Sequence, residues 1–365
     1  MKYITKLTKQ ASLFLIVASL LSGCSKISEL TETTKRESQT APSIYVATVE
    51  TTTESTQDPS ETTERETSAV PSGDYLENLK ALRKCMEERA GYYNTLTQEA
   101  PDTWCFIRKK DHEPSGDYEN FDMKKYDSYY LNDHVPEGDK VVYLTFDCGY
   151  ATNRTQSILD TLAKHNVKAN FFVTKMYLEG CQDYAKRMKE EGHMVCNHTV
   201  HHEDLTKLDA EDIISEMFDV AEYFYEITGY PIDPYFRTPT GSYSDRVLTM
   251  VKDAGYQTVF WSFAYDDYDQ NNQPSVDFIL DHYEKFHHNG AIILMHNDSQ
   301  SNVEALDRVL TYMEGQGYRF GLLDEIYPRE STMPVMLTPI PTSDVTANTT
   351  AASTETTIDP SAPTA

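Results

Sequence analysis

The sequence predicts an α/β fold: a distorted, incomplete (β/α) barrel with an N-terminal aromatic lead-in and disordered tails. Between residues 140 and 329, apolar runs of strand length alternate with amphipathic helical stretches, which is typical of a parallel sheet with right-handed crossovers. This segment of roughly 190 residues is shorter than the ~250 residues of an eight-unit barrel. We therefore expect an incomplete barrel, and the alternative is an open doubly wound sheet.

The expected elements follow from the local pattern of apolar residues. Residues 141–146 form a nearly continuous apolar run, as in a strand that is buried on both faces. Residues 209–228 place Ile213, Met217 and Val220 in the spacing of an amphipathic helix. The further expected strands are 169–173, 193–197, 258–262, 291–295 and 319–320, and the further expected helices are 154–164, 183–191, 244–254, 275–286 and 302–314.

The chain on either side of this segment differs in composition. Residues 25–72 are rich in Thr, Ser and Glu, and residues 330–365 are rich in Thr and Pro, so neither segment can bury enough apolar surface to fold. We expect a tether in the first and assign no role to the second. Residues 73–139 form the lead-in, with a helical pattern over 74–89 and irregular aromatic packing at 126–131.

The N-terminus combines three early lysines with a short apolar run over 11–23, which is too short to span a bilayer. The run ends in Leu21-Ser22-Gly23-Cys24, which resembles a bacterial lipobox, in which the cysteine is diacylated. An ordinary secretory signal is the alternative. We expect residues 1–24 to be a lipoprotein signal peptide and Cys24 to anchor an exported protein to the cell membrane, facing the cell wall.

The net charge limits the class of partner. The 365 residues carry 58 acidic and 32 basic side chains, a formal net charge of −26. Binding to nucleic acid needs basic surface that displaces counterions from phosphate, so a general nucleic-acid binder is excluded. Polybasic attachment to a membrane is excluded for the same reason, and the charge suits an uncharged or amine-containing partner.

A set of polar residues lies in loops that follow expected strands or precede a turn. They are Asp147, His198, His202, Arg237, Asp267 and His296. In parallel α/β folds the loops after the strands share one face, where catalytic groups collect. We therefore expect these six side chains to lie together.

The residue types within this set indicate metal-assisted hydrolysis. His198 and His202 are four apart, and in a helical turn they face one side and can hold one divalent ion. A polar helix cap with surface histidines is the alternative. Asp147 is suited to deprotonate a metal-bound water and His296 to protonate a leaving group.

Five motifs in this segment together resemble those of the polysaccharide deacetylases, a carbohydrate esterase group with a nodulation-protein-type domain and a distorted (β/α) barrel. They are Thr145-Phe146-Asp147-Cys148-Gly149, His198-Thr199-Val200-His201-His202, Arg237-Thr238-Pro239-Thr240-Gly241, Asp267-Tyr268 and Leu294-Met295-His296. The resemblance implies a role for each matching residue. Asp147 would be the base and His296 the acid, with Arg237 bracing the base and Asp267 supporting His296. The implied metal ligands are His198 and His202. The implied substrate contacts are Leu294, which would line the acetyl pocket, the backbone N–H of Thr240, which would hold the oxyanion, and the side chains of Tyr150 and Trp261.

One position departs from the family pattern. Cys148 stands where the family has a second Asp, normally the third metal ligand. A thiolate with two histidines is a good zinc set, so zinc is the expected ion, but a cysteine that does not bind metal is equally open. Delta-lactam-forming muramic acid deacetylases resemble this chain in lacking that Asp. Their sequences are also similar to it at residues 125–131, 260–265 and 302–306.

The remaining cysteines leave several pairings open. Cys85 and Cys105 could form a bridge in the lead-in, because an exported domain permits disulfides. Cys196 could lie near Cys148. Alternatively, these cysteines and Cys181 are small buried apolar residues.

The expected function is hydrolytic removal of N-acetyl groups from peptidoglycan, from muramic acid residues, with delta-lactam formation as an optional sequel. Deacetylation of N-acetylglucosamine, chitin or xylan is one alternative, and an inactive wall-binding lipoprotein is another. The expected partners are an acetylated glycan and, through the lipid anchor, the membrane. The expected cofactor is a divalent metal, and the protein is expected to be a monomer.

Overall fold

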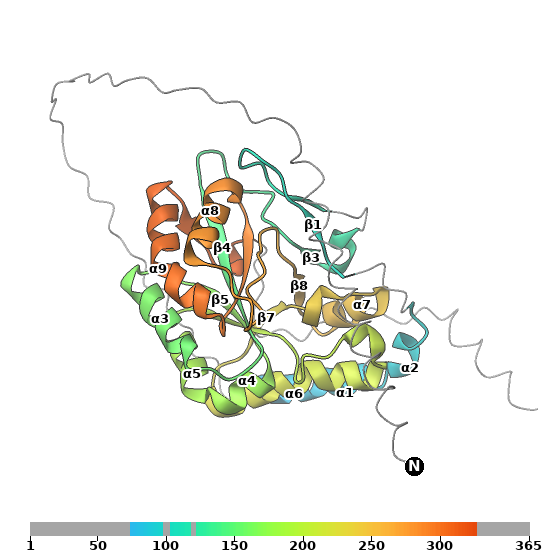
Figure 1. Ribbon diagram of the computed structural model, residues 1–365. Helices are drawn as coiled ribbons and strands as arrows, with labels where there is room; N and C mark the ends of the chain where they lie inside the picture. The colour runs from blue at the N-terminus through green and yellow to red at the C-terminus, as the bar shows by residue number, and fades with distance from the viewer. Residues whose placement is uncertain (1–73, 98–102, 118–121, 327–365) are drawn as a thin grey trace, which may run out of the picture. The chain divides into compact units, whose positions relative to one another are not determined.

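The computed structural model describes residues 74–97, 103–117 and 122–326 (Figure 1). The expected signal peptide with Cys24, the linker at 25–72 and the tail at 330–365 lie outside these residues. In the described part of the chain, no helix is both long and apolar enough to cross a membrane.

The core is a curled parallel sheet. Its strands are, in spatial order, β9 (Ile292–His296), β4 (Val141–Cys148), β5 (Asn170–Val173), β6 (Met194–Asn197), β7 (Asp233–Phe236) and β8 (Gln257–Val259). The chain beyond β8 returns to β9, where the Leu294 amide donates to the Phe263 carbonyl at 2.9 Å. These contacts bring the two ends of the sheet together, which confirms the predicted incomplete barrel.

Helices cover the outside of the curl (Figure 1). They are α3 (Arg154–Lys164), α4 (Lys175–Gly180), α5 (Gln182–Glu190), α6 (Ala210–Thr228), α7 (Asp245–Asp253), α8 (Val276–Phe286) and α9 (Gln300–Gly315). Helix α6 shows why such helices form where they do. The Asp209 carboxylate caps its first turn by accepting from the Asp212 amide, and Gly229 ends it with a φ of 75°. The predicted strands and helices are present with bounds shifted by about three residues at most.

Strand β7 is an element that the pattern did not predict. It begins with Asp233 and Pro234, which are uncommon inside strands, so no apolar run marks it. The Asp233 carboxylate instead accepts hydrogen bonds from the Val195 amide at 2.6 Å and from Lys189 Nζ at 2.7 Å. A polar side chain therefore fixes the start of this strand against β6.

The lead-in is more regular than expected. It contains α1 (Asp74–Glu87), α2 (Ala90–Tyr93), the hairpin of β1 (Phe106–Ile107) and β2 (Gly116–Asp117), and β3 (Ser128–Tyr129). The prediction of irregular packing was wrong at 128–129, because β3 pairs in parallel with β8 and extends the sheet. Three single turns of 3-10 helix, at Leu205–Lys207, Pro239–Gly241 and Leu323–Glu325, and the two-residue β10 (Arg319–Phe320) complete the segment from β4 onward.

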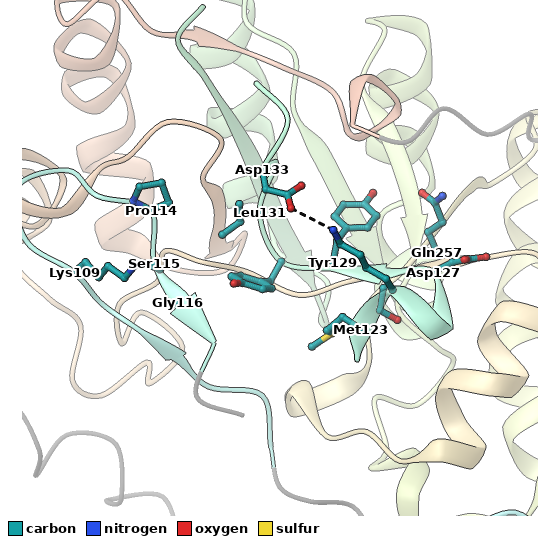
Figure 2. Close-up of a pocket in the computed structure, with 13 residues that line it drawn as sticks. Lys109, Pro114, Ser115, Gly116, Met123, Asp127, Tyr129, Leu131, Asp133 and Gln257 are labelled. Carbon is teal, nitrogen blue, oxygen red and sulfur yellow. Dashed lines mark ion pairs between the residues drawn. The ribbon is translucent and has the colours of Figure 1, made fainter. Parts of the chain in front are cut away.

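A cavity of about 460 Å³ lies between the lead-in and the amino end of β8 (Figure 2). Tyr130, Met123 and Gln257 line it, and so do Lys124 and Asp133, which form an ion pair at 3.6 Å. None of the predicted site residues contributes to it, since those residues follow the carboxyl ends of the strands.

Candidate active site

Asp147 is the last residue of β4 that points to the interior of the curled sheet, and a fully buried arginine binds its carboxylate. Arg237 Nη1 donates to Asp147 Oδ1 at 2.7 Å and to Thr145 Oγ1 at 2.9 Å, and its Nε donates to the Val259 carbonyl. Burial opposes ionisation of Asp147, but Arg237, His198 and His296 outweigh it and hold the pKa of this carboxyl below its usual value. Asp147 is therefore a carboxylate at neutral pH.

His296 lies opposite Asp147 in the pairing of β4 with β9. Its Nδ1 is 2.7 Å from Asp267 Oδ1, and its backbone amide donates to Asp267 Oδ2 at 2.8 Å. Asn302 Nδ2 donates to the same Oδ2 at 2.5 Å. Burial alone lowers the pKa of His296, but the carboxylates of Asp267, Asp147 and Asp298 raise it to about 9. The site thus joins an ionised carboxylate to a protonated imidazole.

His198 and His202 meet, but not on a helix. Residues 198–202 form an irregular loop in which Thr199 has a φ of 74° and His202 a φ of 58°, so the expectation of a helical turn was wrong. The loop follows directly after β6, and its two positive φ values lie outside the right-handed helical region, so residues 198–202 cannot form a helical turn. The two rings still lie 4.8 Å apart between centroids, at 76° to each other.

The two histidines have donor chemistry that fits a divalent cation. His198 Nδ1 is 2.8 Å from the Arg237 carbonyl, so it carries the proton and leaves the lone pair of Nε2 free. Nε2 is buried, lies 3.5 Å from Asp147 Oδ2 and has no hydrogen-bond partner within the described ranges. Burial lowers the pKa of His198 to about 4 and also lowers the pKa of His202, so both rings are neutral.

Cys148 is not brought to these histidines. Successive residues of a strand point to opposite faces, so Cys148 faces away from Asp147 into the core beneath the helices. Its thiol donates to the Phe146 carbonyl at 3.7 Å, and burial raises its pKa well above the usual value. Among the residues that the structure describes, no cluster of three His, Cys, Asp or Glu side chains is arranged to hold a metal. The placement matches the alternative in which Cys148 belongs to the core.

Cys85, Cys105, Cys181 and Cys196 form no disulfide among the residues that the structure describes. Cys85 is exposed on α1 and Cys105 is half-buried, so the bridge considered for them is not formed. Cys196 lies in a different apolar cluster from Cys148.

The predicted substrate contacts lie on β9, in the turn after β7 and in the connections after β4 and β8. Leu294 lies two residues before His296 and on the same face of β9, with 8% of its surface exposed. Thr240 occupies a tight turn with a φ of 57°. Trp261 is half-buried, and Tyr150 is 61% exposed three residues after Asp147.

Two supporting residues were not predicted as such. Trp104 of the lead-in donates from its amide to the Gly241 carbonyl and from Nε1 to the Trp261 carbonyl, both at 2.9 Å. Glu216, on α6, accepts hydrogen bonds from the histidine loop. The signal for Glu216 was a charged residue at a position where the helix pattern calls for an apolar one.

Comparisons with known proteins agree with this geometry. The profile of the family described as polysaccharide deacetylase matches residues 134–259. Peptidoglycan-N-acetylmuramic acid deacetylase PdaA of Bacillus subtilis (strain 168) is 41% identical over 237 residues, which are 64% of this chain and 89% of that protein. A solved structure of Bacillus subtilis PdaA, described as a family 4 carbohydrate esterase, gives a TM-score of 0.59 at 40% identity and covers 63% of this chain and 98% of that one.

Two further relatives differ in their described activity. The peptidoglycan-N-acetylglucosamine deacetylase of Bacillus cereus is 33% identical over 200 residues, 54% of this chain and 92% of that protein. The structure of BA3943, described as a pseudoenzyme of the CE4 family from Bacillus anthracis, gives a TM-score of 0.50 at 28% identity over 55% of this chain and 68% of that one. The curled parallel sheet and the extent of the similarity show that the chain belongs to the polysaccharide deacetylase family, whose members are hydrolases that act on amide bonds.

Proposed function

We propose that the protein removes N-acetyl groups from peptidoglycan, and that muramic acid is the sugar it deacetylates. The observation that carries the proposal is the pairing of Asp147 with His296 on adjacent strands, one ionised and the other protonated at neutral pH. The choice of muramic acid is supported by the higher identity to PdaA, 41%, than to the N-acetylglucosamine deacetylase, 33%.

The proposed reaction is a hydrolysis with a separate base and acid. Asp147 takes a proton from water as the water oxygen bonds to the acetyl carbonyl carbon, giving a tetrahedral oxyanion that the Thr240 N–H stabilises. His296 then gives its Nε2 proton to the sugar nitrogen, the carbon–nitrogen bond breaks, and acetate and a free amine result. Arg237 keeps Asp147 ionised and fixed, and Asp267 keeps His296 protonated and oriented.

A divalent ion, zinc in our proposal, belongs to this site. His198 and His202 would hold it, and when bound it would lower the pKa of water and polarise the acetyl carbonyl. The proposal that Cys148 is a third ligand has no support from its position in the core.

We also propose that Cys24 anchors the protein to the outer face of the cell membrane and that residues 25–72 carry the enzyme into the wall. The support is the sequence alone: the lipobox-like Leu21-Ser22-Gly23-Cys24 and the Thr-, Ser- and Glu-rich composition that follows it. Lipid labelling of the wild type and of Cys24→Ala tests this. Equal labelling of both would contradict it.

The function is tested by mass spectrometry of peptidoglycan after incubation with the wild type or with Asp147→Asn. Both intact strands and strands freed of stem peptides should be used. We expect deacetylated muramic acid with the wild type only. Deacetylated glucosamine alone would replace the proposed sugar. Glycan binding without acetate release would favour the inactive alternative, of which the Bacillus anthracis pseudoenzyme is a precedent in the same family.

A further inference from the structure

The loop that carries both histidines is tied to α6 by one buried carboxylate. Glu216 is only 6% exposed and occupies the buried face of α6, close in sequence to Ile213 and Met217. A carboxylate at such a position loses its hydration, and that cost must be offset by hydrogen bonds from the protein. Glu216 takes no part in the proposed acid–base chemistry, so its burial calls for another explanation.

Three donors from the loop converge on this carboxylate. Glu216 Oε2 accepts from the backbone amides of Val200 and His201, each at 2.9 Å, and Oε1 lies 2.6 Å from Nδ1 of His201. The His201 ring is therefore directed to Glu216, and its side chain is 60% exposed. The His201 side chain thus helps to hold the loop on Glu216, whereas the rings of His198 and His202 lie together at the site.

The conformation of this loop needs such support. Thr199 and His202 both have positive φ values, 74° and 58°, which residues with a β-carbon adopt rarely and keep only when their surroundings determine them. Val200 and His201, the two residues that donate to Glu216, lie between these two positions. Asn197 supports the same loop by accepting from the Thr199 amide at 3.0 Å and donating to the Met217 carbonyl at 2.8 Å.

We propose that Glu216 is a positioning residue that fixes how the His198 and His202 rings face each other, and thereby sets the affinity of the site for a divalent cation. The inference rests on the metal site of the proposed function. Replacing a residue that orients metal ligands without binding the metal itself typically lowers the metal affinity about 10–100-fold. Glu216 acts on the pair through the backbone amides of Val200 and His201 and through the His201 ring.

The test is titration of the full chain with Zn²⁺ and, for its visible spectrum, with Co²⁺, without substrate. Glu216→Ala is expected to raise the dissociation constant about 10–100-fold. Glu216→Gln keeps one carbonyl oxygen that can accept from the two backbone amides. This variant should therefore lose less affinity for Zn²⁺ than the alanine variant does. Glu226→Gln is the matched control, because Glu226 lies exposed on the same helix. This variant should bind Zn²⁺ with the affinity of the wild type.

Thermal unfolding separates positioning from simple loss of the fold. The proposal is overturned if Glu216→Ala is folded at the assay temperature and binds Zn²⁺ as the wild type does. If that variant does not fold, Glu216→Asp, whose carboxylate reaches one methylene less far, decides by the same criterion. A wild type that binds no divalent ion would overturn the inference, whereas failure to release acetate from any glycan would overturn the proposed function alone.

Discussion

Replacement of Asp267 by Asn tests the proposed acid most directly. Asp267 is the carboxylate in contact with His296, and with its neighbours it brings the pKa of that imidazole from the usual 6.5 to about 9. If Asp267→Asn returns the pKa to its usual value, the protonated fraction of His296 at pH 7.5 falls from about 97% to about 9%. The rate of a step that needs the protonated imidazole should then fall about tenfold.

The sign of the pH dependence distinguishes this explanation from general damage. A raised pKa means that activity persists as pH rises and is lost only as pH passes about 9. In Asp267→Asn the alkaline limb of kcat/KM should move to lower pH, and at pH 6 the rate should recover to within about twofold of wild type. The assay is acetate release across pH 5.5–10, with Asp266→Asn as the control, since Asp266 is exposed and adjacent in sequence. A variant profile that runs parallel to the wild type at every pH would refute the reasoning.

Three further changes probe other parts of the site. Asp147→Asn should abolish acetate release, because an amide cannot accept the proton of water; the thermal midpoint should also fall, since the buried Arg237 loses its carboxylate partner, and near-normal turnover would remove Asp147 from the mechanism. Cys148→Ser should lower the free energy of unfolding by about 1–3 kcal/mol, since a hydroxyl replaces a thiol in the core, and should leave zinc affinity unchanged. A sulfur-to-cobalt charge-transfer band that is present in the wild type and absent from this variant would contradict that placement. Trp104→Phe should cost about 0.5–1.5 kcal/mol by losing the hydrogen bond to the Trp261 carbonyl. It should also lower kcat more than it raises KM, and unchanged kinetics would mean that the lead-in does not support the site.

Regular elements were predictable because each carries its own pattern. The apolar run of β4 and the stripe of α6 are visible in the residues themselves, so both elements were located closely. Strand β7 was not, because Asp233 is fixed by Lys189 and by the Val195 amide, and these contacts join segments about 40 residues apart.

The site divides in the same way. Positions after strands predicted that Asp147 and His296 would meet, since strand ends share one edge in a parallel sheet. Arg237 was expected there from its place before a turn, and β7, which positions it beside Asp147, was not predicted. The spacing of His198 and His202 suggested a helix, whereas the loop is held by Glu216 of α6. The helix pattern marks Glu216 as unusual, but its contact with the loop joins residues 15 and 16 positions apart and is not visible in either segment alone. The direction of Cys148 follows from strand alternation once the inward direction of Asp147 is known.

The pairing of Asp147 with His296 in the ladder between β4 and β9 has a consequence for how the enzyme can diverge. Hydrogen-bonded neighbours in a sheet are about 4.8 Å apart whatever side chains surround them. The spacing of the two backbone positions that carry the proton-transferring groups is thus set by the sheet, whereas Tyr150, Thr240 and Trp261 come from connections between elements. Exchange of those connections for the ones of a relative that acts on another sugar should redirect substrate choice while leaving the proton-transfer pair in place.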